Sequence, residues 1–598
     1  MRNIDPETDI DRLIIEKLLP AVQKPSQYVG VEINARNKDP LRAETSFVIA
    51  FPDAYEIGIS HLGSRSLYHS INDLDYAAAD RTYCPLVDAE KVMRKEGIPL
   101  FGWESRYPVG RFDAVGFSMG YELCVTNVLT MLDLSGIPLE SSQRRDGDPL
   151  VIGGNEMADS PESMAKFIDV FLPGDGEVSL VSLAEIIRKA KASGIGRDRL
   201  LEEIATGHPA AYVPRFYSHP EPWPAPPRPA VNKVPEKIGR GYLEDLADTS
   251  PSLVTRPIVP HLEGVHDRLT IEIMRGCPNS CRFCQAGWLR RPVRYRKTED
   301  IIECLCTAID ATGYDEISLL SLSSGDYPGL DKLIDRLNSK LENRNISISL
   351  PSLKFDTQLA LLPKLTSTVR RSGFTVAAEA GSERMRKATG KNINETDMLN
   401  GVSAAWAAGY RSIKVYFMAG LPGETEDDVE SIVELCKKLS NTRRSHDGHR
   451  GSITASVSWF VPKPHTPMQW EGMKNEEYMW QTRKKLKELA RGTAVQVKFH
   501  RIEQSLLEAF ISRSGPEAAD TILAAWRGGA RMDAWREHWD WKIWQEAISK
   551  TGADFERVVY SSLDPGLPLP WSHVSPGIKD QTLIMQRDAM NEVLAGNW

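Results

Sequence analysis

"RLTIEIMRGCPNSCRFCQAGW", residues 268–288, joins a short apolar run to three closely spaced cysteines. The run has the length and β-branched content of a strand, and the glycine and proline that follow it break that pattern. Cys277, Cys281 and Cys284 fall within eight positions of a chain that has only eight cysteines in all. We therefore expect a strand whose carboxyl end carries a thiolate site, the edge at which βα-barrel enzymes place their chemistry.

The number and spacing of these thiols favour an iron–sulfur cluster. Three thiolates suffice for a four-iron cluster when the fourth iron is left for another ligand, whereas a closed structural zinc site takes four protein ligands. No His or Cys follows at zinc-finger spacing before Cys304. Cys304 and Cys306 lie two apart on a predicted helix, so they face different directions and are interpreted as core residues. Structural zinc stays the alternative.

The cysteine strand opens a series in which strands alternate with helical patterns. Six such strands, with helices between them, predict a partial (β/α)6 barrel, shorter than the closed eight-strand form, over residues 263–470. The five later strands lie in "EISLLSLSS" (316–324), "NISISLPSL" (345–353), "GFTVAAEAGSE" (373–383), "RSIKVYFMAGLPGETEDD" (411–428) and "ITASVSWFVPKPHTP" (453–467).

A separate βα series precedes the barrel. Short apolar runs such as "SFVIAF" (46–51) and "LVIGGN" (150–155) alternate with helical spacing, which predicts a Rossmann-like, doubly wound parallel sheet over residues 41–215. A helical arm is expected over 1–40. A linker is expected over 216–262, because "HPEPWPAPPRP" (219–229) is more than half proline. Residues 471–598 are predicted to be mostly helical and are rich in tryptophan. The fold class is therefore α/β.

Composition limits the classes of function. The chain has 598 residues, 41% of them apolar and 26% charged, as in ordinary globular proteins of several domains. A net charge of −8 gives no general attraction to nucleic acid, so nucleic acid is not expected as a partner. No apolar run approaches the length of a membrane span or a signal peptide. Sparse, scattered cysteines suit a reducing compartment, so we expect a cytoplasmic protein.

The motif "CPNSCRFC" (277–284), a CxxxCxxC with an aromatic residue before the last cysteine, resembles that of the radical S-adenosylmethionine (SAM) superfamily. The resemblance implies a [4Fe–4S] cluster whose open iron binds SAM. In enzymes of that superfamily an electron from the cluster cleaves SAM to methionine and a 5′-deoxyadenosyl radical, which then abstracts hydrogen from the substrate. An electron donor such as flavodoxin or ferredoxin is implied as a partner.

Other barrel segments resemble the SAM-binding elements of that superfamily. "SSGDY" (323–327) resembles the loop that holds the SAM amino group, and "AAEAGSERMRK" (377–387) resembles the strand that contacts ribose and, through an arginine, the carboxylate. "FMAGLPGETEDD" (417–428) resembles the adenine loop, and its Thr425 and Asp428 also form a capping-box pattern. The residues implied to bind SAM are Ser324, Gly325, Asp326, Glu379, Arg384, Gly420, Pro422 and Gly423.

The first domain resembles cobalamin-binding domains. "PDAYEIG" (52–58) is similar to their Asp-x-His-x-x-Gly loop, with Tyr55 in the place of histidine. A phenol is not the neutral imidazole that commonly ligates metals, so we expect cobalamin to be held without a protein histidine. His61 is not assigned as a ligand. The residues implied to contact cobalamin are Asp53, Tyr55, Gly58, Ser118, Gly153 and Gly154.

Taken whole, the chain resembles a fused family of radical SAM proteins with an N-terminal cobalamin-binding-like domain. Three further stretches support the resemblance without a derived role: "PLFGWESRYP" (99–108), "SWFVPKPHTPMQW" (458–470) and "LPLPWSHV" (567–574). No cysteine follows Cys436, so a second cluster in the C-terminal region is not expected, which argues against the sulfur-inserting branches. Trp535 and Trp539 are interpreted as packing or lid residues rather than a base-stacking platform.

Three functions stay open. The first is a radical SAM enzyme in which cobalamin assists methyl transfer or rearrangement at an unactivated carbon. The second is a radical SAM enzyme that modifies RNA or another macromolecule without bound cobalamin. The third is a non-catalytic cobalamin or redox sensor, which would need neither the cysteine triad nor the SAM loops. The substrate cannot be deduced, because hydrogen abstraction requires only a suitably held C–H bond.

Overall fold

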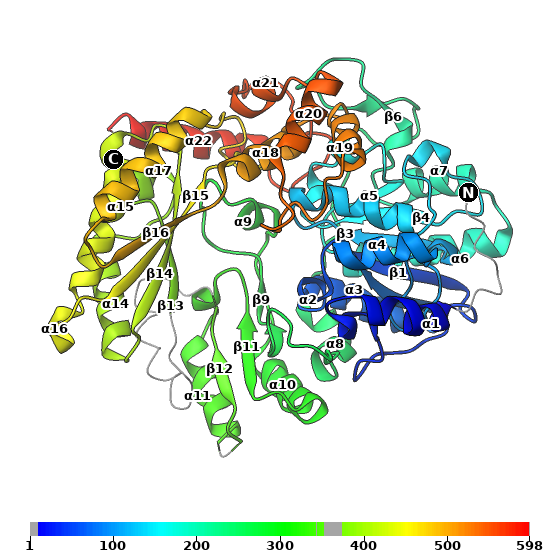
Figure 1. Ribbon diagram of the computed structural model, residues 1–598, viewed down its shortest axis with the longest axis horizontal. Helices are drawn as coiled ribbons and strands as arrows, with labels where there is room; N and C mark the ends of the chain where they lie inside the picture. The colour runs from blue at the N-terminus through cyan, green and yellow to red at the C-terminus, as the bar shows by residue number, and fades with distance from the viewer. Residues whose placement is uncertain (1–9, 343, 352–373, 597–598) are drawn as a thin grey trace.

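The computed structural model describes residues 10–342, 344–351 and 374–596 (Figure 1). Residues 1–9 of the predicted arm, and the helix expected between the third and fourth barrel strands, lie outside the described residues. Within the described ranges no helix is long and apolar enough to cross a membrane. The predicted α/β class is confirmed, with two parallel-sheet units and a helical C-terminal region.

The first unit is built on a parallel five-stranded sheet in the order β2-β1-β3-β4-β5. Its strands are β1 (Thr45–Phe51), β2 (Ala77–Tyr83), β3 (Ala114–Ser118), β4 (Leu150–Gly154) and β5 (Val170–Leu172). Every residue of β1 is buried, which explains why the strand reads as a continuous apolar run. The strand order reverses between β1 and β3, the point at which open parallel sheets bind ligands.

Helices cover this sheet. α3 and α6 pack against each other and against β1, whereas α5 packs against α19 from the C-terminal region. The helices of the unit are α2 (Tyr55–Gly58), α3 (Leu62–Asn72), α4 (Val87–Glu96), α5 (Val125–Leu134), α6 (Gly176–Ser193) and α7 (Arg197–Gly207), and α19 is Ala518–Arg527. Before the sheet, α1 (Ile10–Leu13) is followed by short turns of π and 3-10 helix.

The connection to the second unit contains short elements: β6 (Tyr217–Ser218), β7 (Arg228–Pro229) and α8 (Pro251–Thr255). α8 packs between α3 of the first unit and α10 of the second. The connecting segment is thus in contact with both units.

The second unit contains all six strands predicted for the partial barrel. Their described residues pair in parallel as two sheets, β12-β11-β8 and β13-β14-β15-β16. The strands are β8 (Leu269–Glu272), β11 (Glu316–Leu320), β12 (Ser347–Ser349), β13 (Phe374–Glu379), β14 (Ser412–Ala419), β15 (Ser452–Trp459) and β16 (Val495–Phe499). The intervening helices include α10 (Thr298–Thr312), α11 (Leu330–Lys340), α13 (Glu383–Ala388), α14 (Glu395–Ala407), α15 (Glu426–Asn441) and α17 (Glu476–Ala490).

Two features differ from the predicted elements. β16 is a seventh parallel strand, which the sequence analysis missed, and it pairs with β15 at the edge of its sheet. The stretch 535–547, which lies in the region predicted to be mostly helical, begins with turns, and its helix starts at Trp541. Asp540 caps this helix by accepting a hydrogen bond from the Lys542 N–H at 3.0 Å, which fixes the start there.

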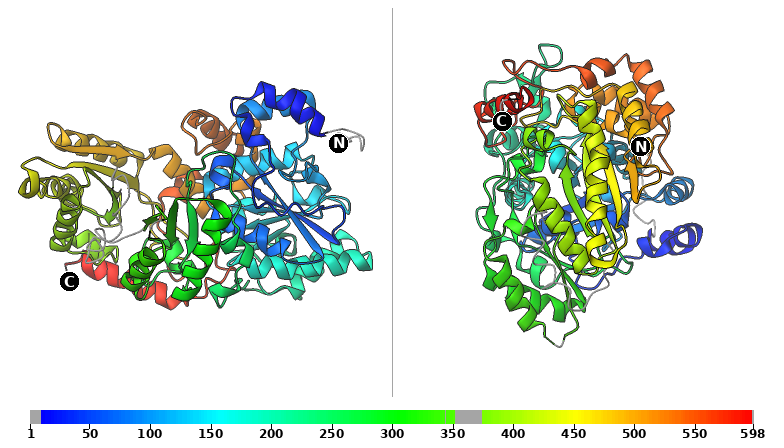
Figure 2. Two further views of the ribbon diagram at one scale, coloured as in Figure 1. Left: turned by 90° about the horizontal axis from the view of Figure 1, so that it is seen from below. Right: turned by 90° about the vertical axis from the view of Figure 1, so that its left-hand side faces the viewer.

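The C-terminal helices join the two units. They are α18 (Ile502–Arg513), α19, α20 (Trp541–Thr551), α21 (Phe555–Tyr560) and α22 (Asp580–Leu594). α19 packs on α5 of the first unit, and α22 packs on α13 of the second. Figure 2 shows α22, in red, running along the second unit. One continuous apolar cluster includes residues of the sheets of both units and of α18 to α21, so the core extends across the units.

Candidate active site

The cysteine triad lies on a loop at the carboxyl end of the first barrel strand. β8 is followed by β9 (Met274–Arg275), and Cys284 caps α9 (Gln285–Leu289) by accepting the Gly287 N–H at 3.4 Å. All three thiols are half-buried. Burial, together with the nearby Cys284 and Cys277 thiols, raises the pKa of Cys281 to about 12. The three sulfur atoms therefore share one electrostatic environment.

This donor set fits an iron–sulfur cluster. In the part of the chain that the structure describes, no three His, Cys, Asp or Glu side chains are arranged to hold a single metal ion. A four-iron cluster places no such demand, because it binds each cysteine through a different iron atom. Three half-buried thiols on one loop can therefore each bind one iron atom of such a cluster, and no fourth protein ligand is required.

The glycine-and-acid loop contacts the cysteine loop directly. Ser324–Asp326 form a 3-10 turn that starts four residues after the last residue of β11. The Asn279 Nδ2 donates to Asp326 Oδ2 at 2.8 Å and to Cys277 Sγ at 3.2 Å, so one side chain links the two loops. The Ser324 hydroxyl is fully buried and donates to the Leu319 carbonyl at 3.1 Å, so it supports the strand end. Asn279 was missed by the sequence analysis, although it lies within the cysteine motif.

Glu379 lies at the end of β13, beside the thiols. Its φ of 66° lies in the left-handed region, at the point where the register between β13 and β14 shifts. The Lys391 Nζ lies 3.3 Å from Glu379 Oε1. Burial opposes the charge on Lys391, but Glu379 and Cys281 raise the pKa of this ammonium above its ordinary value. Lys391 is thus a cation next to the triad, and no motif had pointed to it.

Arg384 faces a different partner from the one implied by the resemblance. Its guanidinium pairs with Asp428 and donates to the Gly423 carbonyl at 2.9 Å. Asp428 is also the third residue of the predicted capping box with Thr425, which the structure confirms. Arg384 therefore braces the loop that follows β14.

That loop, which carries Gly420, Pro422 and Gly423, is closed from outside by α22. Gly423 has a φ of 67°, a conformation that favours glycine, and a Cβ there would lie 2.8 Å from Leu594 Cδ1. The Gly420 N–H donates to Glu424 Oε2 at 2.6 Å, and the Tyr478 hydroxyl donates to the same oxygen at 2.7 Å. Burial raises the pKa of Glu424 to about 7.

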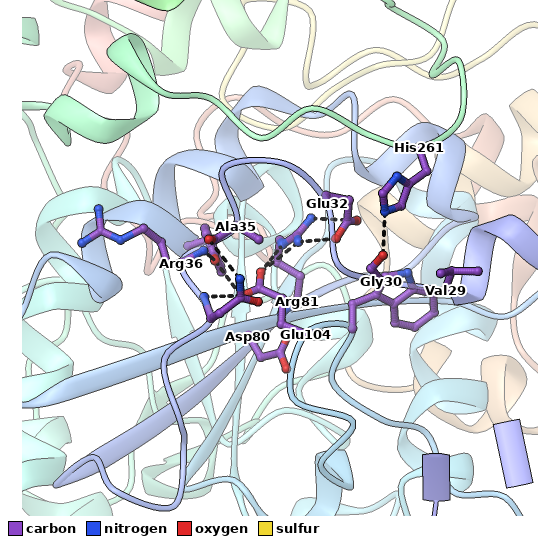
Figure 3. A network of polar contacts seen from close by, with 12 residues as sticks. Val29, Gly30, Glu32, Ala35, Arg36, Asp80, Arg81, Glu104 and His261 are labelled. Carbon is purple, nitrogen blue, oxygen red and sulfur yellow. Dashed lines mark hydrogen bonds and ion pairs between the residues drawn. The ribbon is translucent and has the colours of Figure 1, made fainter. Parts of the chain in front are cut away.

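The first loop of the cobalamin-like pattern is packed inside the protein. Asp53 accepts hydrogen bonds from the Trp535 indole and the Ala54 N–H, both at 2.7 Å, and from the Tyr121 hydroxyl. The Tyr55 hydroxyl donates to Glu32 at 3.1 Å. Figure 3 shows this Glu32 paired with Arg81, which also pairs with Glu104. A Cβ on Gly58 would lie 2.4 Å from the Tyr83 ring. The described structure thus engages all three predicted residues in internal contacts.

The later elements of the pattern line a cavity of about 530 Å³. It lies between the carboxyl edge of the first sheet and the β8–β9 segment, and it includes Ser118 and Gly154 but not Gly153. A Cβ on Gly153 would lie 2.6 Å from Met119, whereas one on Gly116 or Gly154 would have only backbone oxygens near it, at 3.9 Å. Gly116 and Gly154 therefore leave an open surface over the sheet. Gly116 was not among the predicted cobalamin contacts, because it lies inside β3 and not in a loop.

His61 also lines this cavity. As the N-cap of α3, its Nδ1 accepts the Ser64 N–H at 3.0 Å. Burial lowers the pKa of this imidazole to about 4, so the ring is neutral and carries its proton on Nε2. His61 therefore presents an N–H at Nε2 toward its surroundings.

Comparison with known families identifies the chain. Residues 63–214 match the family described as Radical SAM proteins, N-terminal, and residues 271–436 match the Radical SAM superfamily. The chain is a radical SAM protein. The two matches together cover more than half of its length, and the cysteine triad lies inside the second. Members of this superfamily use a [4Fe–4S] cluster and SAM, so these two predicted cofactors are confirmed.

Relatives of this radical SAM protein differ in how much of it they match. The uncharacterized protein MJ0966 of Methanocaldococcus jannaschii is 27% identical over 70% of this chain and 82% of its own length. The tRNA methylthiotransferase MtaB of Treponema pallidum is 26% identical over 29% of this chain. The ribosomal protein uS12 methylthiotransferase RimO of Pseudothermotoga lettingae is 24% identical over 36%. The chain spans only 37% and 53% of the last two relatives.

Two solved structures resemble this radical SAM protein at low similarity. The radical SAM methyltransferase TsrM of Kitasatospora setae, with cobalamin and a [4Fe–4S] cluster bound, has a TM-score of 0.46 and 14% identity, covering 71% of this chain and 74% of its own. The cobalamin-dependent SAM radical enzyme OxsB, with aqua-cobalamin and SAM bound, has a TM-score of 0.46 and 12% identity, covering 92% and 80%.

Proposed function

We propose that this radical SAM enzyme cleaves SAM reductively and uses cobalamin for methyl transfer or rearrangement at an unactivated carbon. The cavity carries the proposal: it connects the ligand-binding edge of the first sheet with the segment that leads into the cysteine triad. When bound, the cluster and SAM would supply the 5′-deoxyadenosyl radical, and cobalamin would supply a carrier for the methyl group. The chain's own residues would hold these groups and exclude water.

The residues around the triad support a specific arrangement of SAM. Cys277, Cys281 and Cys284 would hold the cluster, and Asp326, held by Asn279, would accept hydrogen bonds from the SAM amino group. Lys391 would pair with the SAM carboxylate, because it is a half-buried cation beside the thiols, whereas Arg384 is paired with Asp428. We also propose the roles implied by the resemblance for two further elements: Glu379 would contact the ribose of SAM, and the Gly420–Gly423 loop would contact its adenine.

The first unit supports cobalamin through its cavity rather than through its first loop. Gly116, Ser118 and Gly154 leave room over the sheet for a flat group, between apolar side chains that also line the cavity, Ile49, Leu67, Ile152, Leu172 and Leu180. Tyr55 donates to Glu32 and His61 carries its proton on Nε2. We propose that neither residue ligates cobalt.

The first test is anaerobic reconstitution with iron and sulfide, followed by SAM and dithionite. Wild-type protein should release 5′-deoxyadenosine, and Cys281→Ala should lose both the cluster's visible absorption and SAM cleavage. Cys306→Ala, a half-buried cysteine on α10, is the matched control and should keep both. Stoichiometric zinc in the wild type, with no paramagnetic signal after reduction, would falsify the proposal.

Cobalamin is tested separately, by refolding or titrating the protein with hydroxocobalamin. A retained corrin absorption band with 5′-deoxyadenosine release supports the proposed reaction. Release without a corrin band favours the second candidate, radical modification of RNA or another macromolecule, to which the two methylthiotransferase relatives point by their names. Comparison of tRNA nucleosides and of metabolites between deletion and parent strains would then separate these substrates. Flavodoxin or ferredoxin is the proposed electron donor.

A further inference from the structure

Three arginines flank the cysteine triad, and each reaches across to the first unit. Arg275 lies two residues before Cys277, and Arg290 and Arg294 follow α9. None of the three belongs to the superfamily motif on which the site was predicted. Their partners are acids that follow β4 and β5 of the first unit, and none of these acids is among the predicted site residues.

The segment that runs from the end of β5 into the first turn of α6 contacts two of these arginines. Arg275 Nη2 lies 2.8 Å from Glu177 Oε1, and Arg275 Nη1 lies 3.1 Å from Asp175 Oδ1. Arg294 Nη1 lies 2.5 Å from the other oxygen of Asp175. Asp175 and Glu177 thus hold the residue that leads into the triad.

The loop after β4 contacts the third arginine. Arg290 Nη2 lies 2.8 Å from Glu156 Oε1 and donates to Asn155 Oδ1 at 3.1 Å. Asn155 itself has a φ of 71° and donates from Nδ2 to Ser118 Oγ at 3.3 Å. The segment that leaves the triad is therefore also held by the first unit.

The middle of the cysteine loop is held differently. The Arg282 N–H donates to the Thr389 carbonyl at 2.8 Å, and the Arg282 guanidinium donates to the Lys387 and Ala388 carbonyls, both at 2.9 Å. These acceptors belong to α13 and the residues after it, in the second unit. The loop is thus anchored to the barrel at its centre and to the first unit at both ends.

Burial makes the contacts of Arg275 with Asp175 and Glu177 decisive for geometry, whereas the Arg290–Glu156 pair is half-buried. The side chains of Arg275, Asp175 and Glu177 are exposed by only 11%, 4% and 9%. Buried ion pairs add little net stability, because desolvation offsets their attraction, but breaking one partner leaves a charge unpaired in a dry site. Such pairs are suited to fixing how two surfaces meet.

We propose that Asp175, Glu177 and Glu156 of the first unit are positioning residues that set the cysteine loop, and with it the cluster, against the cavity. All three acids line that cavity, as do Arg275 and Arg290. A ligand in the cavity therefore touches the same ion pairs that hold the triad. The inference rests on the triad as the cluster site, but not on the identity of the ligand in the cavity.

The test measures the loop without the cluster. In apo protein, alkylation of each cysteine by N-ethylmaleimide is followed by peptide mass spectrometry. In Glu177→Gln and Glu156→Gln, the three triad cysteines should react about tenfold faster than in wild type, because local opening becomes easier. The buried Cys84, Cys124 and Cys436 should stay protected, which shows that the fold is intact.

Two variants make the result specific. Glu272→Gln is the matched control: Glu272 also pairs with Arg275, at 2.8 Å, but belongs to β8 of the barrel itself. It should leave the triad near its wild-type reactivity. Glu177→Asp keeps the charge and should restore most of the protection. Should Glu177→Gln expose the core cysteines as well, Glu177→Asp and Glu156→Gln decide the question.

In reconstituted protein, the glutamine variants at 156 and 177 should retain less iron and show an altered electron paramagnetic resonance spectrum of the reduced cluster. Wild-type reactivity in both variants, or an equal effect of Glu272→Gln, overturns the proposal. A wild type that binds a cluster but releases no 5′-deoxyadenosine overturns the proposed function instead, and leaves the alkylation result standing on its own.

Discussion

At the scale of single residues, Lys391 and Arg384 are the two candidates for pairing with the SAM carboxylate. Lys391 lies beside the thiols and Glu379, whereas Arg384 braces the loop after β14 through Asp428. The resemblance implied Arg384, because an arginine after the ribose strand matched the superfamily's pattern. Sequence spacing could not show that a capping-box aspartate would take up its charge.

Lys391→Gln should raise the KM for SAM by about 10- to 100-fold, the expected loss of one charge-assisted hydrogen bond. Arg384→Gln should change that KM by much less and lower the melting temperature instead, because it removes a partner of Asp428. Steady-state release of 5′-deoxyadenosine at varied SAM measures the first effect, and differential scanning calorimetry measures the second. If Arg384→Gln raised the KM and Lys391→Gln did not, Arg384 would be the residue that pairs with the SAM carboxylate.

Glu424 gives a pH dependence whose sign can be worked out. Burial raises the pKa of this carboxyl from its usual 4.5 to about 7 in the folded protein. Between these values the folded state binds more protons than the unfolded state, so stability falls as the pH rises through the window and then levels off. The cost above pH 7 is at most about 3 kcal/mol.

Glu424→Gln should therefore melt at a higher temperature than wild type at pH 8, because the neutral amide avoids the cost of burying a charge. The two proteins should converge below pH 4.5, where the wild-type carboxyl is neutral in both states. Thermal melts across this range give the comparison. A difference that stays constant with pH would mean that Glu424 does not titrate as inferred.

At the scale of elements, a side chain placed on β3 can fill part of the cavity over the first sheet. A side chain at Gly116 would enter the cavity, since a Cβ there meets only the Val48 carbonyl at 3.9 Å. Gly116→Val should weaken hydroxocobalamin binding by at least about tenfold, because the branched side chain occupies the space proposed for the ligand. The cluster and SAM cleavage should persist in the absence of cobalamin.

Gly147→Val is the control for that variant, because no atom of the described residues lies within 4 Å of a Cβ at Gly147. Titration followed by absorption gives both affinities. Equal affinities in wild type and Gly116→Val would place the corrin elsewhere.

The elements also show how far sequence patterns reach. The six barrel strands were predicted because each combines apolar residues with a following helix, and the cysteine motif fixed the first. β16 was missed: "VQVKF" (495–499) is short, and its polar residues Gln496 and Lys498 are exposed on an edge strand. Its alternation was a signal that the surrounding helical residues obscured. The first cobalamin-like loop matched by spacing, but spacing could not show that Trp535 donates to Asp53 from 482 positions away.

At the scale of the whole molecule, the C-terminal helix seals the carboxyl end of the second unit. Met590 is buried in an apolar cluster with Leu421, Phe460 and Met468, against which Phe283 of the cysteine motif also packs. Because Phe283 lies between Cys281 and Cys284, the cysteine loop packs against the same cluster. Contacts that distant in sequence follow from packing, and no local pattern around residue 590 predicted them.

Met590→Asp should open this seal, because an unpaired carboxylate does not stay in an apolar cluster. The reconstituted cluster should then lose its visible absorption in air at least about fivefold faster than in wild type, as oxygen and water reach the iron through the loosened helix. Met585→Asp on the same helix is the control, because Met585 is already 61% exposed and should leave the bleaching rate unchanged. Equal rates in Met590→Asp and wild type would show that α22 covers the adenine loop without protecting the cluster.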